Sequence, residues 1–170
     1  MSRAGIETLL YMMDMAFEGR TNEVWGNWHA LLENLSSVRD EDWNWLPEKG
    51  ERTIFHLVSD LGMCKYAYAS AAFDDGSMNW DKQGTIPELK AGSAPDVAIQ
   101  YLQNAQHYWR GKVAELPDDE ELTKSRTGPW GTQHETRWLI KTMIEHDIYH
   151  AGEINHIRAL AQGNDGPGND

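Results

Sequence analysis

Two histidines one helical turn apart are the side chains in this sequence best placed to do chemistry. His146 and His150 lie in the stretch EHDIYHAGEINHIRAL, residues 145–160. On a helix that turns by about 100° per residue, side chains four positions apart project within about 40° of each other. Two imidazoles arranged in this way can bind one divalent metal ion. Because this spacing is common in helices, the direction in which both rings point decides between a ligand pair and ordinary polar residues.

The apolar residues of the same stretch indicate that both rings point inward. They fall on the side of the helix that carries the two histidines: Leu139, Met143, Ile154 and Ile157. A single buried histidine is more often a hydrogen-bonded core residue than a metal ligand. Two stacked imidazoles need several partners at once, because each unsatisfied buried polar group costs about 1–3 kcal/mol. We therefore predict that His146 and His150 share a metal ion, and we expect His156, on another side of the helix, at the surface or in an interface.

A third ligand is expected from another helix, and residues 52–73 offer two candidates. Asp60 lies about 70° from the centre of the apolar stripe of that segment, whereas His56 lies about 110° away. Asp60 also has the apolar neighbours Val58 and Leu61, where an uncompensated carboxylate is costly. We predict that Asp60 completes the site. The alternative is an aspartate at the edge of the stripe that reaches solvent or pairs with an arginine.

The elements that must position these residues are helices, because helical periodicity dominates and no useful length shows the alternation of a strand. Four helices that each bury one stripe favour an all-α four-helix bundle. The linker at residues 74–94 is long enough to run back along the bundle, so the second and third helices are expected to be parallel neighbours. The predicted helices cover residues 6–36 with an interruption at 19–22, 52–73, 95–116 and about 132–162.

Capping residues mark the ends of these predicted helices. Ser93 is expected to cap the third helix, and Thr132 with Glu135 resembles a capping box before the fourth. Gly163 is expected to end the fourth helix. We predict one domain at residues 1–162, a flexible glycine-rich tail at residues 163–170, more than half of the chain in helix and essentially no strand.

Composition restricts the classes of partner. With 27 acidic and 15 basic residues the net charge of -12 disfavours nucleic acid and anionic membranes. The single cysteine, Cys64, excludes an intrachain disulfide and is expected to be a buried apolar residue. No stretch is apolar enough to span a membrane or to form a secretory signal, so we expect a cytoplasmic protein. Eight Trp must line a core, a pocket or an interface, and we expect a homodimer.

Two stretches of the chain resemble a known family. HDIYHAGEINHIRAL is similar to the last-helix signature of the DinB-like superfamily, which includes YfiT-like thiol transferases and mycothiol-dependent isomerases, and RTIFHLVSDLGMCKYAY, residues 52–68, resembles its second-helix segment. The resemblance implies a metal bound by three histidines, two of which match His146 and His150. The third stands six positions after an isoleucine, and counting from Ile54 reaches Asp60. The chain therefore departs from the family pattern, because it carries an aspartate where the family has a histidine. An aspartate with two histidines leaves Zn²⁺, Ni²⁺, Fe²⁺ and Mn²⁺ open as the divalent ion.

The resemblance also implies a metal-dependent enzyme that acts on a small molecule and transfers or uses a low-molecular-weight thiol. Hydrolysis by metal-bound water is the competing chemistry, and a non-catalytic, dimeric, stress-related protein with a structural metal is the other alternative. Asp147 and Glu153 are candidates for orienting the histidines, and Glu153 is also a candidate ligand. Trp130, in the segment Gly-Pro-Trp-Gly at residues 128–131, is a candidate pocket wall. The sequence contains no glycine-rich phosphate loop and no serine nucleophile elbow.

Overall fold

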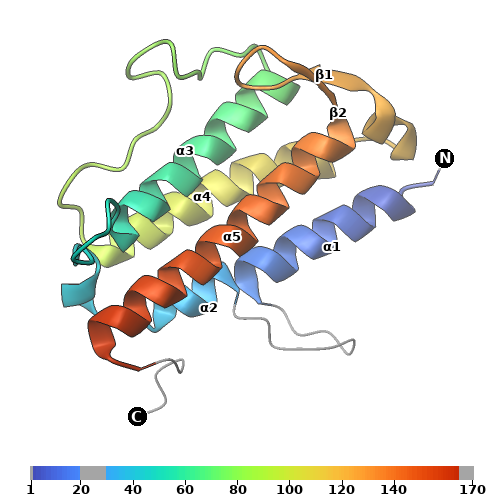
Figure 1. The fold of residues 1–170 in the computed structure, drawn as a ribbon. Coiled ribbons are helices and arrows are strands. Elements are labelled where there is room, and N and C mark those ends of the chain that lie inside the picture. Colours follow the sequence, from blue (N-terminus) through green and yellow to red (C-terminus); the bar gives the residue numbers. More distant parts are fainter. Residues whose placement is uncertain (1, 20–29, 165–170) are drawn as a thin grey trace.

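The computed structural model describes residues 2–19 and 30–164, and α-helices account for more than half of them. Four of the helices are long and pack side by side in a bundle, as Figure 1 shows. This arrangement confirms the predicted all-α class. The α-helices of the described residues are α1 (Ala4–Glu18), α2 (Leu31–Ser36), α3 (Ile54–Phe73), α4 (Pro95–Ala114) and α5 (Thr136–Gln162). Two short 3-10 helices, η1 (Asp40–Asp42) and η2 (Asp119–Thr123), lie in the connections.

The first predicted helix is two separate helices in the structure. α1 ends at Gly19, whose φ of 73° is the left-handed conformation that glycine adopts without strain. After the residues outside the described part of the chain, α2 begins at Leu31. Leu35 is buried there, whereas Trp25 and Trp28 lie outside the described residues.

α3 and α4 are neighbours along their length. Gly62 permits this close packing, because a side chain at that position would collide with the ring of Tyr101. In Figure 1 the connection at residues 74–94 passes back along the bundle, and both helices run from the lower left to the upper right. α5 crosses the same bundle in the opposite direction in that view and packs on both α1 and α3.

A small hairpin before α5 is absent from the sequence-based prediction. β1 (Ser125–Thr127) pairs antiparallel with β2 (Gln133–Glu135), with Arg126 opposite His134. The predicted capping box is wrong, because Thr132 belongs to the hairpin loop and its hydroxyl lies 2.8 Å from Nε2 of His134. α5 begins at Thr136, after Glu135, whose side chain makes no capping hydrogen bond.

The other two predicted helix ends differ in outcome. Ser93 does not cap α4, because the residue before that helix is Ala94 and the Ser93 hydroxyl donates to the carbonyl of Lys90 instead. Pro95 at the first helical position starts α4 without a side-chain cap, since its ring already fixes a helical φ. Gly163 ends α5 in the left-handed conformation with φ of 69°, as predicted.

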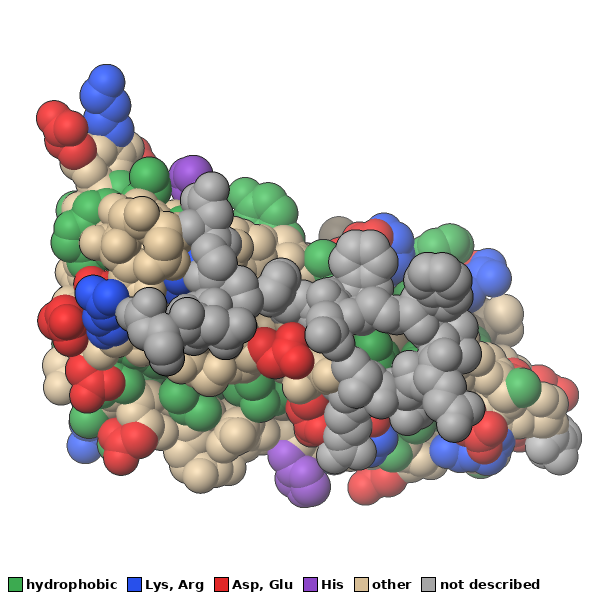
Figure 2. All heavy atoms as spheres, turned by 90° about the horizontal axis from the view of Figure 1, so that it is seen from below, with side chains coloured by type: hydrophobic (Ala, Val, Ile, Leu, Met, Phe, Trp, Pro, Cys, Tyr) green, Lys and Arg blue, Asp and Glu red, His purple; other side chains and the backbone are tan. Residues whose placement is uncertain are grey.

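The buried core consists of two apolar clusters, one toward each end of the bundle. The described tryptophans include both buried and exposed rings: Trp43 and Trp109 are buried, whereas Trp130 and Trp138 are at least half exposed. No helix within the described residues has both the length and the apolar character needed to cross a membrane. On the face seen in Figure 2, acidic and basic side chains lie scattered among hydrophobic ones in the part that the structure describes.

Candidate metal centre

Three side chains converge where α3 packs on α5. Asp60 projects from α3, and His146 and His150 project from α5 one turn apart. One carboxylate oxygen of Asp60, Oδ2, lies 3.7 Å from Nε2 of each histidine. The two Nε2 atoms lie 3.0 Å from each other. The structure therefore brings together the three residues singled out in the sequence.

The separations between these atoms fit one divalent ion. A triangle with sides of 3.0, 3.7 and 3.7 Å has its equidistant point about 2.0 Å from each corner, close to the bonds that zinc makes with nitrogen and oxygen. The two imidazole planes are inclined by 79°, so each ring presents its nitrogen to the shared point from a different direction. A single ion can therefore contact all three atoms without a large movement of either helix.

The site is buried on one side and open on the other. The side chain of His150 is 4% exposed and that of His146 is 22% exposed, which confirms that both rings point inward. The side chain of Asp60 is 44% exposed. The carboxylate is therefore less buried than the sequence argument assumed, and its side is the one from which a small molecule can approach.

The surroundings keep His146 neutral. Burial, together with the neighbouring His150, lowers the pKa of His146 from 6.5 to about 4. A neutral imidazole has a lone pair to offer to a metal ion, whereas an imidazolium has none. Nδ1 of His146 is buried and has no hydrogen-bond partner among the described residues. The ring thus sits in a place where protonation is strongly disfavoured.

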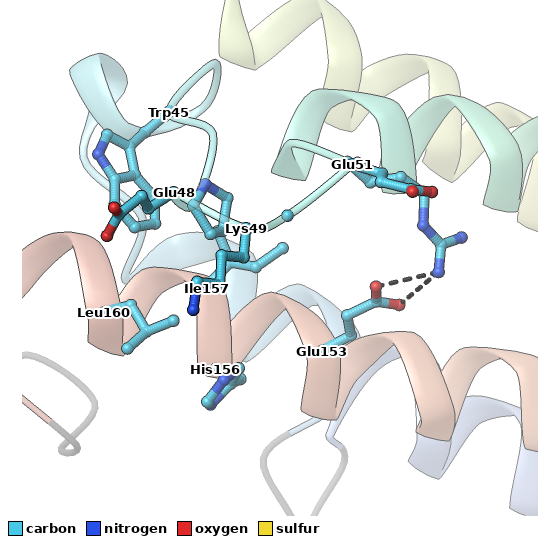
Figure 3. A pocket seen from close by; sticks show the side chains of 11 residues that line it. Trp45, Glu48, Lys49, Glu51, Glu153, His156, Ile157 and Leu160 are labelled. Carbon is cyan, nitrogen blue, oxygen red and sulfur yellow. Dashed lines mark hydrogen bonds and ion pairs between the residues drawn. The ribbon is translucent and has the colours of Figure 1, made fainter.

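Glu153 contacts the ring of His150, and Arg52 in turn contacts Glu153. An oxygen of Glu153 lies 2.9 Å from Nδ1 of His150, the ring nitrogen that faces away from Asp60. Arg52 donates to both oxygens of the same carboxylate at 3.0 and 3.3 Å, as the dashed lines in Figure 3 show. A carboxylate on Nδ1 fixes the tautomer in which Nε2 is free to bind a metal. Glu153 therefore orients His150, as one of the sequence hypotheses held.

Glu153 and Arg52 also line an open pocket of about 860 Å³ beside the three-residue cluster. Figure 3 shows this pocket between α5 and the segment that precedes α3. Its apolar wall includes Trp45, Ile157 and Leu160, while Lys49 lies in the loop opposite. His156 lies at the edge of this pocket and is exposed, as expected.

Asp147 has a different role from the one the sequence suggested. Both of its oxygens accept hydrogen bonds from Nζ of Lys65, at 2.7 and 2.8 Å, and both side chains are only 1% exposed. Burial raises the pKa of Asp147, and the Lys65 ammonium opposes that rise. Since both carboxylate oxygens contact Lys65, Asp147 belongs to a buried ion pair behind the histidines and forms no hydrogen bond with either ring among the described residues.

Two other side chains on α3, His56 and Cys64, do not belong to this three-residue cluster. Nδ1 of His56 accepts a hydrogen bond from the backbone N–H of Thr53 at 3.2 Å, so His56 serves the start of the helix. The thiol of Cys64 lies 4.0 Å from Asp60, and burial raises its pKa to about 12. Cys64 is therefore a protonated, buried thiol, which agrees with its expected apolar role.

The fold and this cluster agree with the comparison with known protein families. A family model described as the DinB superfamily matches residues 20–154, which is more than half of the chain. The chain therefore belongs to the DinB superfamily. A search of curated proteins found no match.

Proposed function

We propose that this chain is a divalent-metal-dependent enzyme whose ion is held by Asp60, His146 and His150, and whose small-molecule chemistry uses a low-molecular-weight thiol. The observation that supports the proposal is the convergence of three ligand atoms from two helices on one point. Membership of the DinB superfamily agrees with a site in this position. Zn²⁺, Ni²⁺, Fe²⁺ and Mn²⁺ are all compatible with two imidazoles and a carboxylate.

The openness of the site favours catalysis over a purely structural metal. Structural zinc sites are usually closed by four protein ligands, whereas catalytic sites keep a position for water or substrate. Here three ligands converge and one of them, Asp60, is 44% exposed. When bound, a divalent ion supplies positive charge that stabilises a thiolate or a hydroxide at neutral pH. The carboxylate of Glu153 keeps the proton of His150 on Nδ1, away from the ion.

Metal content of purified variants tests the ligand set. Asp60→Ala and His150→Ala should each lose the ion that the unaltered chain binds at about one per chain. Asp60→His should still bind an ion, because it supplies a third imidazole. His156→Ala is the matched control, since this exposed histidine lies on the same helix outside the cluster. Circular dichroism would establish that each variant is folded. Retention of the ion by Asp60→Ala would show that Asp60 is not a ligand.

Cobalt substitution tests whether the site accepts a thiol. A small thiol added to the cobalt-loaded chain should produce the absorption of a cobalt–thiolate bond, which His150→Ala should abolish. Hydrolysis by metal-bound water is the alternative within the same site. An ion that remains bound while thiols leave its spectrum unchanged would favour this alternative or a structural role.

A further inference from the structure

A second, smaller pocket lies between α3, α5 and the loop of the β1–β2 hairpin. Its volume is about 220 Å³, and it is more enclosed than the pocket beside Glu153. Three aromatic rings contribute to its walls, from Tyr68 on α3, Trp130 in the hairpin loop and Trp138 on α5. Pro129, Leu139 and Thr142 complete much of the lining.

The helical register places this aromatic pocket in line with the metal centre. On α3, Asp60, Cys64 and Tyr68 follow one another at intervals of four residues, so each lies one turn further along the helix and about 40° around it from the one before. On α5, Trp138 precedes His146 by two such intervals. Eight residues of helix at 1.5 Å per residue separate the two places by about 12 Å on each helix. A separation of this size is within the length of a single elongated small molecule.

The hairpin holds Trp130 over the pocket. The loop is closed by a hydrogen bond from the N–H of Gly128 to the carbonyl of Thr132 at 2.7 Å, and Gly131 has a positive φ of 76°. The indole of Trp130 meets the ring of Tyr68 edge-on, with centroids 5.8 Å apart. Trp130 nevertheless remains 66% exposed. The loop thus presents an indole surface that packing of the core does not use.

Charge and size restrict what this pocket can bind. The guanidinium of Arg137 lies 4.9 Å from the ring centre of Trp138, so a cation already occupies one face of that ring. Among the described residues that line the pocket, none carries a carboxylate. Both facts disfavour a cationic ligand. A volume of about 220 Å³ is below the 300–1,000 Å³ typical of pockets for drug-sized molecules and suits a single ring.

We infer that the substrate of this site carries a neutral aromatic ring, which binds among Tyr68, Trp130 and Trp138 about 12 Å from its metal-binding group. Stacked and edge-to-face contacts with the indoles stabilise the ring. The metal-binding group lies at Asp60 and His146. This inference rests on the proposed function for the position of the head group, whereas the ring pocket can be tested without metal.

The first experiment uses the metal-free chain and benzyl alcohol, with binding followed by saturation-transfer NMR. Trp130→Ala and Trp138→Ala should each weaken binding about fivefold to tenfold, because each removes one ring contact. Both residues are at least half exposed, so the fold should survive. Tyr11→Ala on α1 removes an exposed ring elsewhere and should change nothing. Unchanged binding by both tryptophan variants, or tighter binding of benzyltrimethylammonium, would overturn the inference.

The second experiment uses the metal-loaded chain and a series of phenylalkyl thiols with linkers of increasing length. Affinity should peak where the extended distance from sulfur to ring is about 12 Å, and Trp130→Ala should remove that peak while metal content stays the same. A flat dependence on linker length would overturn the proposed span. Failure of the unaltered chain to bind metal would instead refute the proposed function, and the metal-free experiment would still decide the ring pocket.

Discussion

The two histidines of the candidate centre differ in their surroundings. His150 is oriented by the carboxylate of Glu153, whereas His146 has a buried Nδ1 without a partner among the described residues. For His146, burial and the neighbouring ring together lower the pKa from 6.5 to about 4. The folded chain consequently binds fewer protons at this position than the unfolded chain between these two pH values.

This pKa predicts how stability depends on pH. Unfolding free energy rises with pH wherever the unfolded state binds more protons, so the contribution from His146 is complete above pH 6.5 and is lost as the pH falls toward about 4. As the pH falls from 6.5 to about 4, the denaturant concentration at the midpoint of unfolding of the metal-free chain should therefore decrease. His146→Gln, which cannot be protonated, should give a shallower decrease. An equal slope in both proteins would assign the dependence to other groups.

At this scale the sequence was enough to single out Asp60, His146, His150 and the neighbouring Glu153, but not the partners Arg52 and Lys65. His146 and His150 lie one turn apart on one helix. The helical-wheel angle from the apolar stripe was enough to favour Asp60 over His56. The contact between Arg52 and Glu153 joins residues about one hundred positions apart. Such a contact depends on how α5 packs beside the start of α3, and no local pattern encodes that packing. The pairing of Asp147 with Lys65 was missed for the same reason.

Among the helices, α3 has the most completely capped N-terminus, because Thr53 and His56 cap it reciprocally. The Thr53 hydroxyl accepts a hydrogen bond from the N–H of His56 at 3.3 Å, and His56 Nδ1 accepts one from the N–H of Thr53 at 3.2 Å. This pair satisfies two donors that a helix start otherwise leaves free. Asp60 lies about two turns further along the same helix.

Removal of this cap should weaken the fold without emptying the metal centre. Thr53→Ala is expected to lower the unfolding free energy by about 1 kcal/mol, and Thr53→Ser should lower it much less. Chemical denaturation measures both changes. Metal content of the folded Thr53→Ala variant should remain that of the unaltered chain. Loss of metal from this folded variant would mean that the start of α3 positions Asp60 more tightly than the geometry suggests.

Periodicity predicted the long helices well and the short elements poorly. A helix of twenty or more residues repeats its apolar stripe many times, so α3, α4 and α5 stand out in the sequence. A three-residue strand offers one alternation at most, and the β1–β2 hairpin left no such signal. Thr132 and Glu135 matched the pattern of a capping box, but Glu135 pairs with Ser125 in the hairpin instead.

For the molecule as a whole, the buried ion pair of Lys65 and Asp147 is the feature that costs most to remove from water. It links α3 to α5 inside the bundle, where both charges have lost their hydration. Nζ of Lys65 also lies 5.3 Å from the ring centre of Phe17 on α1, so three helices meet at this ammonium. Self-association of the chain, expected from its tryptophan content, stays a prediction.

Breaking this pair should cost far more than replacing it. Lys65→Met leaves a carboxylate buried without its partner and should lower the unfolding free energy by about 3–5 kcal/mol. The double variant Lys65→Met/Asp147→Leu should recover most of that loss, because two apolar side chains need no partner. Equilibrium denaturation of the single and double variants measures the coupling. If the double variant is as unstable as Lys65→Met, the pair contributes through packing and not through charge.

The distribution of the three ligands over two distant helices has a consequence for the unfolded chain. Asp60 and His146 are separated by more than half of the sequence, and the chain has only one cysteine, so no disulfide joins its parts. An unfolded chain that gathered both residues around one ion would have to close that loop. By the arithmetic used for disulfides, closing it costs about 4–5 kcal/mol of chain entropy. An ion at this centre therefore acts as a removable crosslink that selects the folded chain.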